Sequence, residues 1–322
     1  TRRSSDLGIQ TGDVTKMTTF EEFFDAYKKQ MEYCISLMVN ADNAIDVAHA
    51  ERVPLPYESC MVDDCLSRGL SVQEGGAVYN FTGPQGFGIA NMADSLYAIR
   101  KLVYEDKKVS MEEYKQALAW NYDKGLDQQS VSDMSEMILK GMQDAGMAVN
   151  TDTAKAVLQT VMRLKPTEDQ LRRFTEIHHM IDEVPKFGNA IDDVDYFARD
   201  VAYTYSRPLQ KYMNPRGGHY QAGLYPVSAN VPLGGQTGAT PDGRLAHMPV
   251  ADGVSPSAGK DVNGPTAVIK SCAKMDHLAT AGTLLNQKFT PDVVAGEKGL
   301  DNMASLIRSY FAMDGHHVQF NV

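Results

Sequence analysis

Residues 283–322, TLLNQKFTPDVVAGEKGLDNMASLIRSYFAMDGHHVQFNV, decide the fold class of this chain. The runs TLLNQKF (283–289) and HHVQFNV (316–322) are short and rich in apolar residues, which is typical of buried strands. Between them, GLDNMASLIRSYFAMDG (299–315) repeats its apolar residues at helical spacing. A strand, a helix and a second strand in this order predict a parallel βαβ unit.

Two further runs precede this unit, and we expect both to be strands. They are GLYPVSANVP (223–232) and TAVIKSC (266–272). Residues 233–265 between them are rich in Gly, Pro, Asp and Ser, which predicts a long loop. Long ordered loops in a compact domain are usually functional. The residues alone therefore predict a large α/β protein with a pocket lined by loops.

The rest of the chain is expected to be mainly helical. The segment TFEEFFDAYKKQMEYCISLMV has Thr19 and Glu22 at the spacing of a capping box. A later helix, NMADSLYAIRKLVYEDK, has Asn91 in the place of an N-cap. Residues 119–184 are polar and indicate a peripheral helical elaboration. No linker or internal repeat divides the chain, and its length allows one large domain or two medium ones.

Composition narrows the class of protein. The chain carries 31 basic and 41 acidic side chains, a net charge of −10, with 43% hydrophobic residues, as in ordinary globular proteins. This acidic balance argues against a nucleic-acid partner. No run approaches the ~18 consecutive apolar residues of a membrane span, so no membrane partner is expected. Four scattered cysteines do not form a disulfide scaffold, and we expect a cytoplasmic protein.

Common catalytic motifs do not account for this sequence. GGQTGATPDGR (234–244) lacks the order of a phosphate-binding P-loop. The adjacent pairs His178/His179 and His316/His317 point in different directions, so neither pair binds one metal by itself. No metal site is predicted, and nothing in the sequence marks a cysteine as an activated thiol.

Polar residues on the expected strands are the candidates for a ligand site. Tyr225 and Val227 alternate with Leu224 and Ser228, so they share one strand face. In a barrel, that face can present the Tyr225 hydroxyl to a ligand; the alternative is a tyrosine packed under a loop. A second set consists of amides that either tie down loops or line a polar pocket: Asn286, Gln287, Gln319 and Asn321.

Several longer segments resemble the glycyl radical enzymes, the family typified by pyruvate formate-lyase, and within it the coenzyme-B12-independent glycerol and propanediol dehydratases. The resemblance runs in order along most of the chain and is poorest over residues 119–184. It is carried by ADNAIDVAHAERVPLP (41–56), VQEGGAVYNFTGPQGFGIANMADSL (72–96), PKFGN (185–189), NPRGGHYQAGLYPVSANV (214–231), TGATPDGR (237–244), ADGVSPSAGKDVNGPTA (251–267), GTLLNQKF (282–289) and LIRSYFAMDGHHVQFNV (306–322).

The resemblance implies a fold and a chemistry. It implies a single domain over residues 1–322, incomplete at both ends, that forms part of a ten-stranded α/β barrel, mainly the C-terminal half, with peripheral helices. Such enzymes hold no bound cofactor; a radical-SAM activating enzyme installs a radical on a backbone glycine, and a cysteine thiyl then abstracts hydrogen from a small-molecule substrate. Tyr225 and Val227 then fall on the strand that faces substrate, with Phe81 and Gln85 of the NFTGPQG loop nearby. We also expect a homodimer.

The radical residues themselves are expected outside the chain. The family's Gly-Cys-Val-Glu loop should lie upstream of Thr1 and its Arg-Val-x-Gly-Tyr loop downstream of Val322, and neither pattern occurs here. We therefore expect an internal, inactive fragment with no catalytic residue of its own. The predicted function of the whole enzyme is dehydration of glycerol or propane-1,2-diol. The alternatives are choline C–N cleavage, isethionate C–S cleavage, hydroxyproline dehydration, arylacetate decarboxylation, formate acetyltransferase-like chemistry, or a non-catalytic scaffold.

Overall fold

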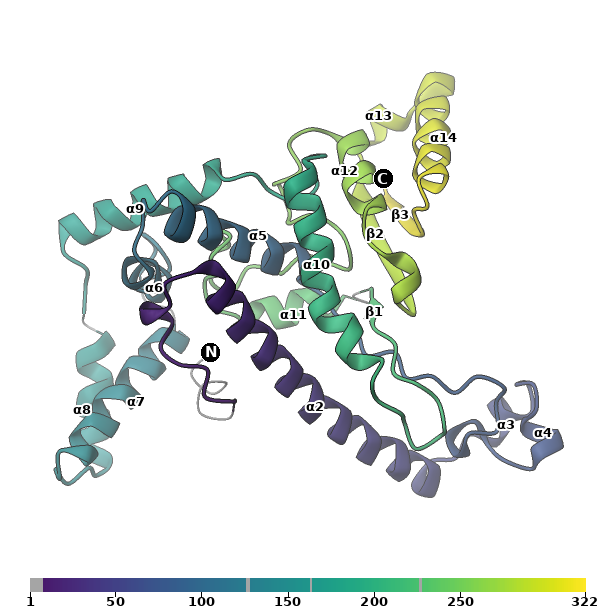
Figure 1. Ribbon diagram of the computed structural model, residues 1–322, viewed down its shortest axis with the longest axis horizontal. Coiled ribbons are helices and arrows are strands. Elements are labelled where there is room, and N and C mark those ends of the chain that lie inside the picture. Colours follow the sequence, from purple (N-terminus) through teal and green to yellow (C-terminus); the bar gives the residue numbers. More distant parts are fainter. Residues whose placement is uncertain (1–7, 126–127, 163, 226–227) are drawn as a thin grey trace.

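Many helices and a small parallel sheet at one side make up the computed structural model, which describes residues 8–125, 128–162, 164–225 and 228–322 (Figure 1). The strands are β1 (Gly223–Leu224), β2 (Gly282–Lys288) and β3 (His317–Asn321). The helices are α2 (Phe20–Arg52), α3 (Pro56–Ser59), α4 (Cys65–Arg68), α5 (Ile89–Ile99), α6 (Met111–Ala119), α7 (Gln128–Asp144), α8 (Thr151–Met162), α9 (Glu168–Glu183), α10 (Asp192–Leu209), α11 (Asn230–Gly235), α12 (Pro265–Ala273), α13 (Pro291–Val294) and α14 (Gly296–Ala312). Single turns of 3-10 helix occur at Val14–Lys16, Val72–Glu74 and His277–Ala279, and α5 continues as a π-helix over Arg100–Glu105.

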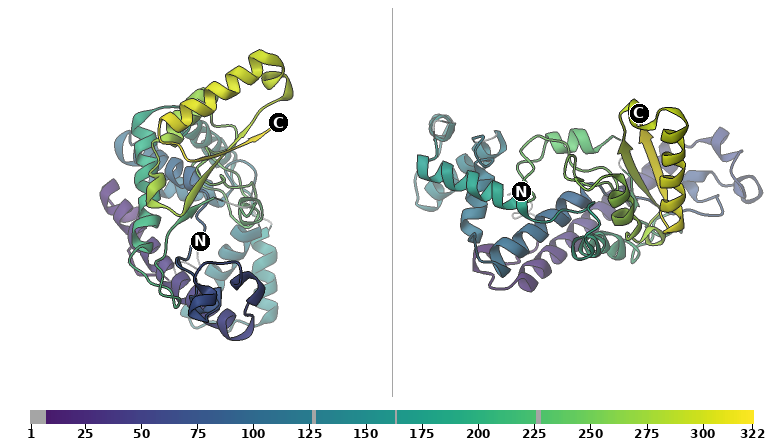
Figure 2. Two further views of the ribbon diagram at one scale, coloured as in Figure 1. Left: turned by 90° about the vertical axis from the view of Figure 1, so that its right-hand side faces the viewer. Right: turned by 90° about the horizontal axis from the view of Figure 1, so that it is seen from above.

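The sheet has the order β1-β2-β3, and all of its strands are parallel. In the register, Gly223 lies opposite Gly282, and Leu285 lies opposite Val318. The βαβ unit predicted from residues 283–322 is confirmed, because α14 connects β2 to β3 (Figure 2). The ten-stranded barrel implied by the resemblance stays a prediction, since the described residues show a mostly helical structure with this small sheet.

The hydrophobic core lies between the sheet and the helices. Helix α5 supplies a nearly continuous buried surface and packs against α10, which also packs against the long helix α2 (Figure 1). Leu285 of β2 is fully buried in this core, together with Ile269 and Cys272 of α12. Helix α9 also contributes buried side chains, whereas α7 and α8 form a pair far from the sheet.

Local signals explain where several elements begin. The capping box at the start of α2 is confirmed, since Thr19 Oγ1 accepts from the Glu22 N–H at 3.2 Å. The predicted cap at Asn91 is wrong: α5 begins earlier, after Gly88. Asn91 is instead buried inside the helix, where its amide donates to Asp242 at 2.6 Å. A longer-range hydrogen bond has thus replaced the local role that the sequence indicated.

Of the four expected strands, one was wrong and one is confirmed only at its start. TAVIKSC (266–272) forms helix α12, which begins at Pro265. Proline has no N–H to donate and fits the first turn of a helix, so the chain enters α12 there. Among the described residues of GLYPVSANVP, Gly223–Leu224 form the strand, and the end of the run belongs to α11. Proline cannot donate to a sheet ladder, which explains why this strand is so short.

The helices of the described residues do not include a membrane span. None of them is both long enough and apolar enough to cross a bilayer.

Candidate functional site

One face of the sheet is covered by helices and the other is open. Along β2, Thr283, Leu285 and Gln287 are buried, and the residues between them are less so. Side chains alternate between the two faces of a strand, so this pattern separates a helix-covered face from an open face. The open face of β2 and β3 carries Gly282, Leu284, Asn286, His317, Gln319 and Asn321.

The segment NFTGPQG (80–86) extends this sheet beyond β1. Gly223 donates its N–H to the carbonyl oxygen of Pro84 at 2.9 Å and accepts from the N–H of Gly86 at 2.7 Å. Gln85 therefore forms a parallel bridge with Gly223. The loop that the resemblance placed near the substrate thus lies beside β1.

Tyr225 directly follows β1, and its ring turns back over that strand. A Cβ atom built on Gly223 would lie 2.8 Å from ring carbons Cε1 and Cζ, and one built on Gly83 would lie 3.4 Å from the phenol oxygen. The open face therefore brings Tyr225 near the NFTGPQG segment, where Gln85 is exposed. Phe81, at the start of that segment, is 49% exposed.

The other sequence-based candidates lie in different places. Val227 lies outside the described residues. Of the amides singled out in the sequence, Asn286, Gln319 and Asn321 are on the open face, whereas Gln287 is buried on the covered face. Gln319 donates to Asn321 Oδ1 at 3.0 Å, so these two side chains pair with each other along β3.

A carboxylate that sequence reasoning missed completes the polar part of the open face. Asp252 accepts a hydrogen bond from Asn286 Nδ2 at 2.5 Å, and Ser255 Oγ accepts from the Asn286 backbone N–H at 2.9 Å. These contacts occupy the edge of β2 that β1 leaves free by ending at Leu224. The pair borders a cavity of about 740 Å³, lined also by Lys288 and Asn321 among other residues. The sequence had indicated Asn286 and Asn321 as amides of a possible polar pocket, but for Asp252 only the general composition of residues 233–265 hinted at a site.

The TGATPDGR motif (237–244) builds structure in this loop. The guanidinium of Arg244 donates to the carbonyl oxygens of Leu245 at 3.1 Å and Met248 at 2.5 Å, and also to that of Gly238. Arg244 is 9% exposed, so these bonds satisfy backbone groups that have little access to water. The motif therefore holds the loop in one conformation.

A buried acid lies next to this loop. Asp94 of α5 is fully buried and accepts the Phe187 backbone N–H on Oδ1 at 2.8 Å. Burial, to which the charge of Asp242 adds, raises the pKa of Asp94 to about 8. Its second oxygen, Oδ2, has no hydrogen-bond partner among the described residues.

The described cysteines and histidines do not form a reactive centre. Cys272 is fully buried, and burial raises the pKa of its thiol well above the usual value. His277 donates or accepts through Nδ1 at 2.8 Å from Thr283 Oγ1, and burial lowers its pKa. Within the described ranges no group of three or more His, Cys, Asp and Glu residues is arranged to hold a metal ion.

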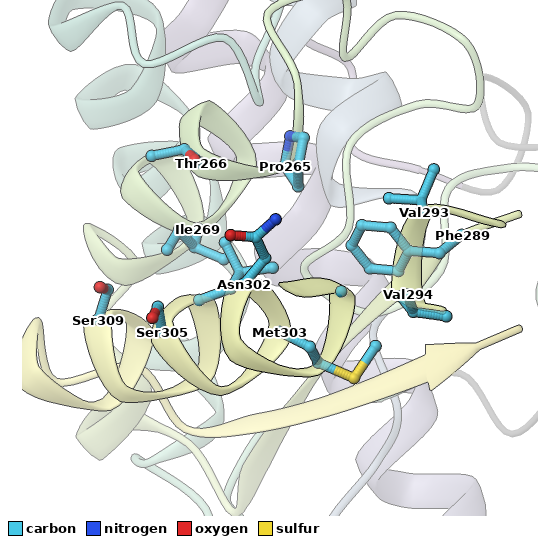
Figure 3. A pocket seen from close by; sticks show the side chains of 12 residues that line it. Pro265, Thr266, Ile269, Phe289, Val293, Val294, Asn302, Met303, Ser305 and Ser309 are labelled. Atoms are coloured by element: carbon cyan, nitrogen blue, oxygen red, sulfur yellow. The ribbon is translucent and has the colours of Figure 1, made fainter. Parts of the chain in front are cut away.

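A second cavity, of about 390 Å³, lies among α12, α13 and α14 (Figure 3). Apolar side chains such as Ile269, Phe289 and Met303 line it, with the amide of Asn302 at its border. Tyr225 and the residues of the NFTGPQG segment do not line it. They do not line the 740 Å³ cavity either, so the candidate substrate wall is placed on the open sheet face by the position of the Tyr225 ring beside that segment.

Comparison with known protein families identifies the family of this chain. A family model described as Pyruvate formate lyase-like matches residues 1–234, and a model described as Glycine radical matches residues 250–322. The chain thus belongs to the glycyl radical enzymes of the pyruvate formate lyase-like family. The second match shows that the domain named for the glycyl radical is represented in this chain.

Individual relatives are similar over nearly the whole chain. A structure concerned with 1,2-propanediol dehydration in Roseburia inulinivorans is 60% identical, with a TM-score of 0.94, over 98% of this chain and 38% of its own. The B12-independent glycerol dehydratase of Clostridium butyricum, solved with glycerol, is 46% identical, with a TM-score of 0.79, over 98% of this chain and 34% of its own. Trans-4-hydroxy-L-proline dehydratase of Clostridioides difficile is 39% identical over 98% of this chain and 34% of its own. The chain spans about a third of the length of these relatives.

Proposed function

We propose that this chain forms part of a glycyl radical lyase that removes water from a small diol, propane-1,2-diol or glycerol. The observation that carries the proposal is the 60% identity, over 98% of the chain, to the protein studied in 1,2-propanediol dehydration. Similarity to the glycerol dehydratase supports the same substrate class. We also propose a radical-SAM activating enzyme as partner, a homodimer as the assembly, and the cytoplasm as the location.

The open sheet face suits the part that a substrate wall must play. In such an enzyme the glycyl radical would be passed to a cysteine, and the resulting thiyl radical would abstract hydrogen from the substrate carbon. Cys65 and Cys272 are both buried, and the described residues that form the open face offer polar and aromatic groups rather than a thiol. The proposed role of Tyr225 is to direct its hydroxyl at a substrate hydroxyl, and that of Gln85 is to add an amide contact.

Small diols need directional contacts because they have little apolar surface to bury. Each hydrogen bond to a substrate hydroxyl contributes to binding and to the choice of which hydroxyl leaves. The pairing of Asp252 with Asn286 gives the same face a fixed carboxylate. In the proposed enzyme these groups orient the diol and limit the access of water to the carbon radical.

The test is an anaerobic substrate panel on the activated enzyme that carries this chain. The panel contains propane-1,2-diol, glycerol, trans-4-hydroxyproline, choline and isethionate. We expect an aldehyde from at least one diol, and a doublet radical signal in electron paramagnetic resonance before substrate is added. Turnover of hydroxyproline alone would replace the proposal with the alternative that the Clostridioides difficile relative supports.

The role of Tyr225 has a separate test. Tyr225→Phe removes the hydroxyl and keeps the ring, so turnover of the diol should fall while the yield of glycyl radical is retained. Unchanged kcat and KM would remove Tyr225 from the substrate wall.

A further inference from the structure

We propose that Gly223 is a positioning residue whose missing side chain sets how deeply the Tyr225 ring lies against the sheet, and thereby which diol fits beside the phenol. The inference rests on the proposed function, because it gives Tyr225 a place in the substrate wall. It adds a specificity determinant in β1 that touches the tyrosine and acts through it.

The contact between Gly223 and Tyr225 leaves no room for a methyl group. A Cβ atom on Gly223 would lie 2.8 Å from both Cε1 and Cζ of the ring and 3.0 Å from its oxygen. Ordinary contacts of a Cβ atom begin at 3.4 Å. An alanine here would therefore push the ring away from the sheet by roughly half an ångström or more.

The backbone at Gly223 does not itself require glycine. Gly223 is not among the glycines with a positive φ, and it forms regular sheet hydrogen bonds on the side of the NFTGPQG segment. A residue with a Cβ atom can adopt this conformation. The close approach of the tyrosine ring is then the structural reason for a glycine at this position.

Glycines in the two neighbouring segments also lie under the Tyr225 ring, where no side chain separates it from the backbone. Gly83 lies beside the phenol oxygen, at 3.4 Å from its constructed Cβ, and Gly282 lies beside the ring, at 3.4 Å from Cε1. Gly282 is also the register partner of Gly223. The ring of Tyr225 thus rests on backbone contributed by three adjacent segments, which fixes the height of its hydroxyl above the sheet.

A raised ring changes the space above the open sheet face in a predictable direction. It moves the hydroxyl toward the substrate and reduces the space next to it. Glycerol carries one hydroxyl more than propane-1,2-diol, so glycerol should suffer more from the lost space. A displacement of this size in a positioned catalytic site can cost up to about 100-fold in rate.

The experiment is a double-mutant cycle in the activated enzyme that carries this chain. The variants are Gly223→Ala, Tyr225→Ala and the combination of both, with Gly235→Ala as the matched control. Gly235 has nothing within 4 Å of a constructed Cβ and no positive φ, so its substitution should change nothing. For each variant we would measure the radical yield by electron paramagnetic resonance, and kcat and KM for both diols.

We expect Gly223→Ala to keep the radical yield, and to lower kcat/KM about 10-fold or more for propane-1,2-diol and further for glycerol. In the Tyr225→Ala background the same substitution should change kcat/KM less than about 2-fold, because the ring that it displaces is gone. An equal loss in both backgrounds would overturn the proposal.

The proposal can still be tested if a variant does not fold or if the parent enzyme does not turn over a diol. If Gly223→Ala does not fold, the double variant decides: folding that returns with Tyr225→Ala supports the proposal, because the ring that the methyl would meet at 2.8 Å is gone, and failure to fold in both backgrounds overturns it. If the parent enzyme turns over no diol, the proposed function is wrong. The cycle is then measured with the substrate that the panel identifies, and the coupling between Gly223 and Tyr225 decides the inference alone.

Discussion

Asp94→Asn tests whether the buried acid beside the 237–244 loop is neutral in the folded protein. Asp94 has no exposed surface, and its Oδ1 accepts from the Phe187 N–H. Burial is the main cause that raises its pKa to about 8, and Asp242 adds to it, while Lys186 and Lys260 act in the opposite direction. Asparagine has the shape of the protonated acid, can accept the same hydrogen bond and carries no charge at any pH.

The direction of the pH dependence follows from the raised pKa. Between the ordinary aspartate pKa of 3.8 and the raised value of about 8, the folded protein holds a proton on Asp94 that the unfolded chain has released. The contribution of Asp94 to the free energy of unfolding is therefore greatest at low pH and is lost as the pH rises toward and through 8. Since each pKa unit corresponds to ~1.4 kcal/mol, the loss between pH 5 and pH 8 amounts to about 3–4 kcal/mol.

The assay is calorimetric unfolding of the parent protein and the Asp94→Asn variant from pH 5 to pH 8. Groups far from Asp94 titrate equally in both proteins, so the difference between their stabilities reports on Asp94 together with Lys186, whose pKa the Asp94 charge raises. We expect the variant to gain stability relative to the parent by about 3 kcal/mol or more as the pH rises over this range. A difference that stays constant with pH, or that changes in the opposite direction, would refute a neutral Asp94.

Three other substitutions test the packing around the sheet and the loop. Arg244→Lys should lower the free energy of unfolding by about 2–3 kcal/mol, because lysine cannot reproduce the guanidinium bonds to the loop carbonyls; a melting temperature like that of the parent would contradict this role. Leu285→Ala should cost about 2–5 kcal/mol in denaturant unfolding, since Leu285 is fully buried in the core, and a loss below about 1 kcal/mol would mean that the site is loosely packed. Thr19→Ala should cost about 1 kcal/mol through loss of the capping box, measured in the same way, with Thr19→Ser expected to restore stability.

The fold could be predicted from the sequence where local and long-range forces agree. β2, α14 and β3 follow the periodicity of residues 283–322, because their buried positions repeat at the spacing of each element. TAVIKSC misled because it is a short run with five of its seven residues buried, which periodicity alone does not separate into strand or helix. The decisive signal was Pro265, just before the run.

The candidate site was predictable only in part. Alternation and the family resemblance pointed to Tyr225, and the NFTGPQG segment indeed lies next to it. Gly223 escaped notice because a glycine's role here is the space that it leaves, which depends on a ring folding back from two residues away. Asp252 and Asp94 depend on partners distant in the chain, Asn286 and Phe187, and local patterns carry no record of such pairs.

The most direct test of the substrate wall is a crystal structure of the enzyme that carries this chain, determined with propane-1,2-diol under anaerobic conditions. The account predicts a diol on the open sheet face, with one hydroxyl within hydrogen-bonding distance of the Tyr225 phenol oxygen. A diol bound instead in the cavity among α12, α13 and α14, with the open face empty, would contradict it.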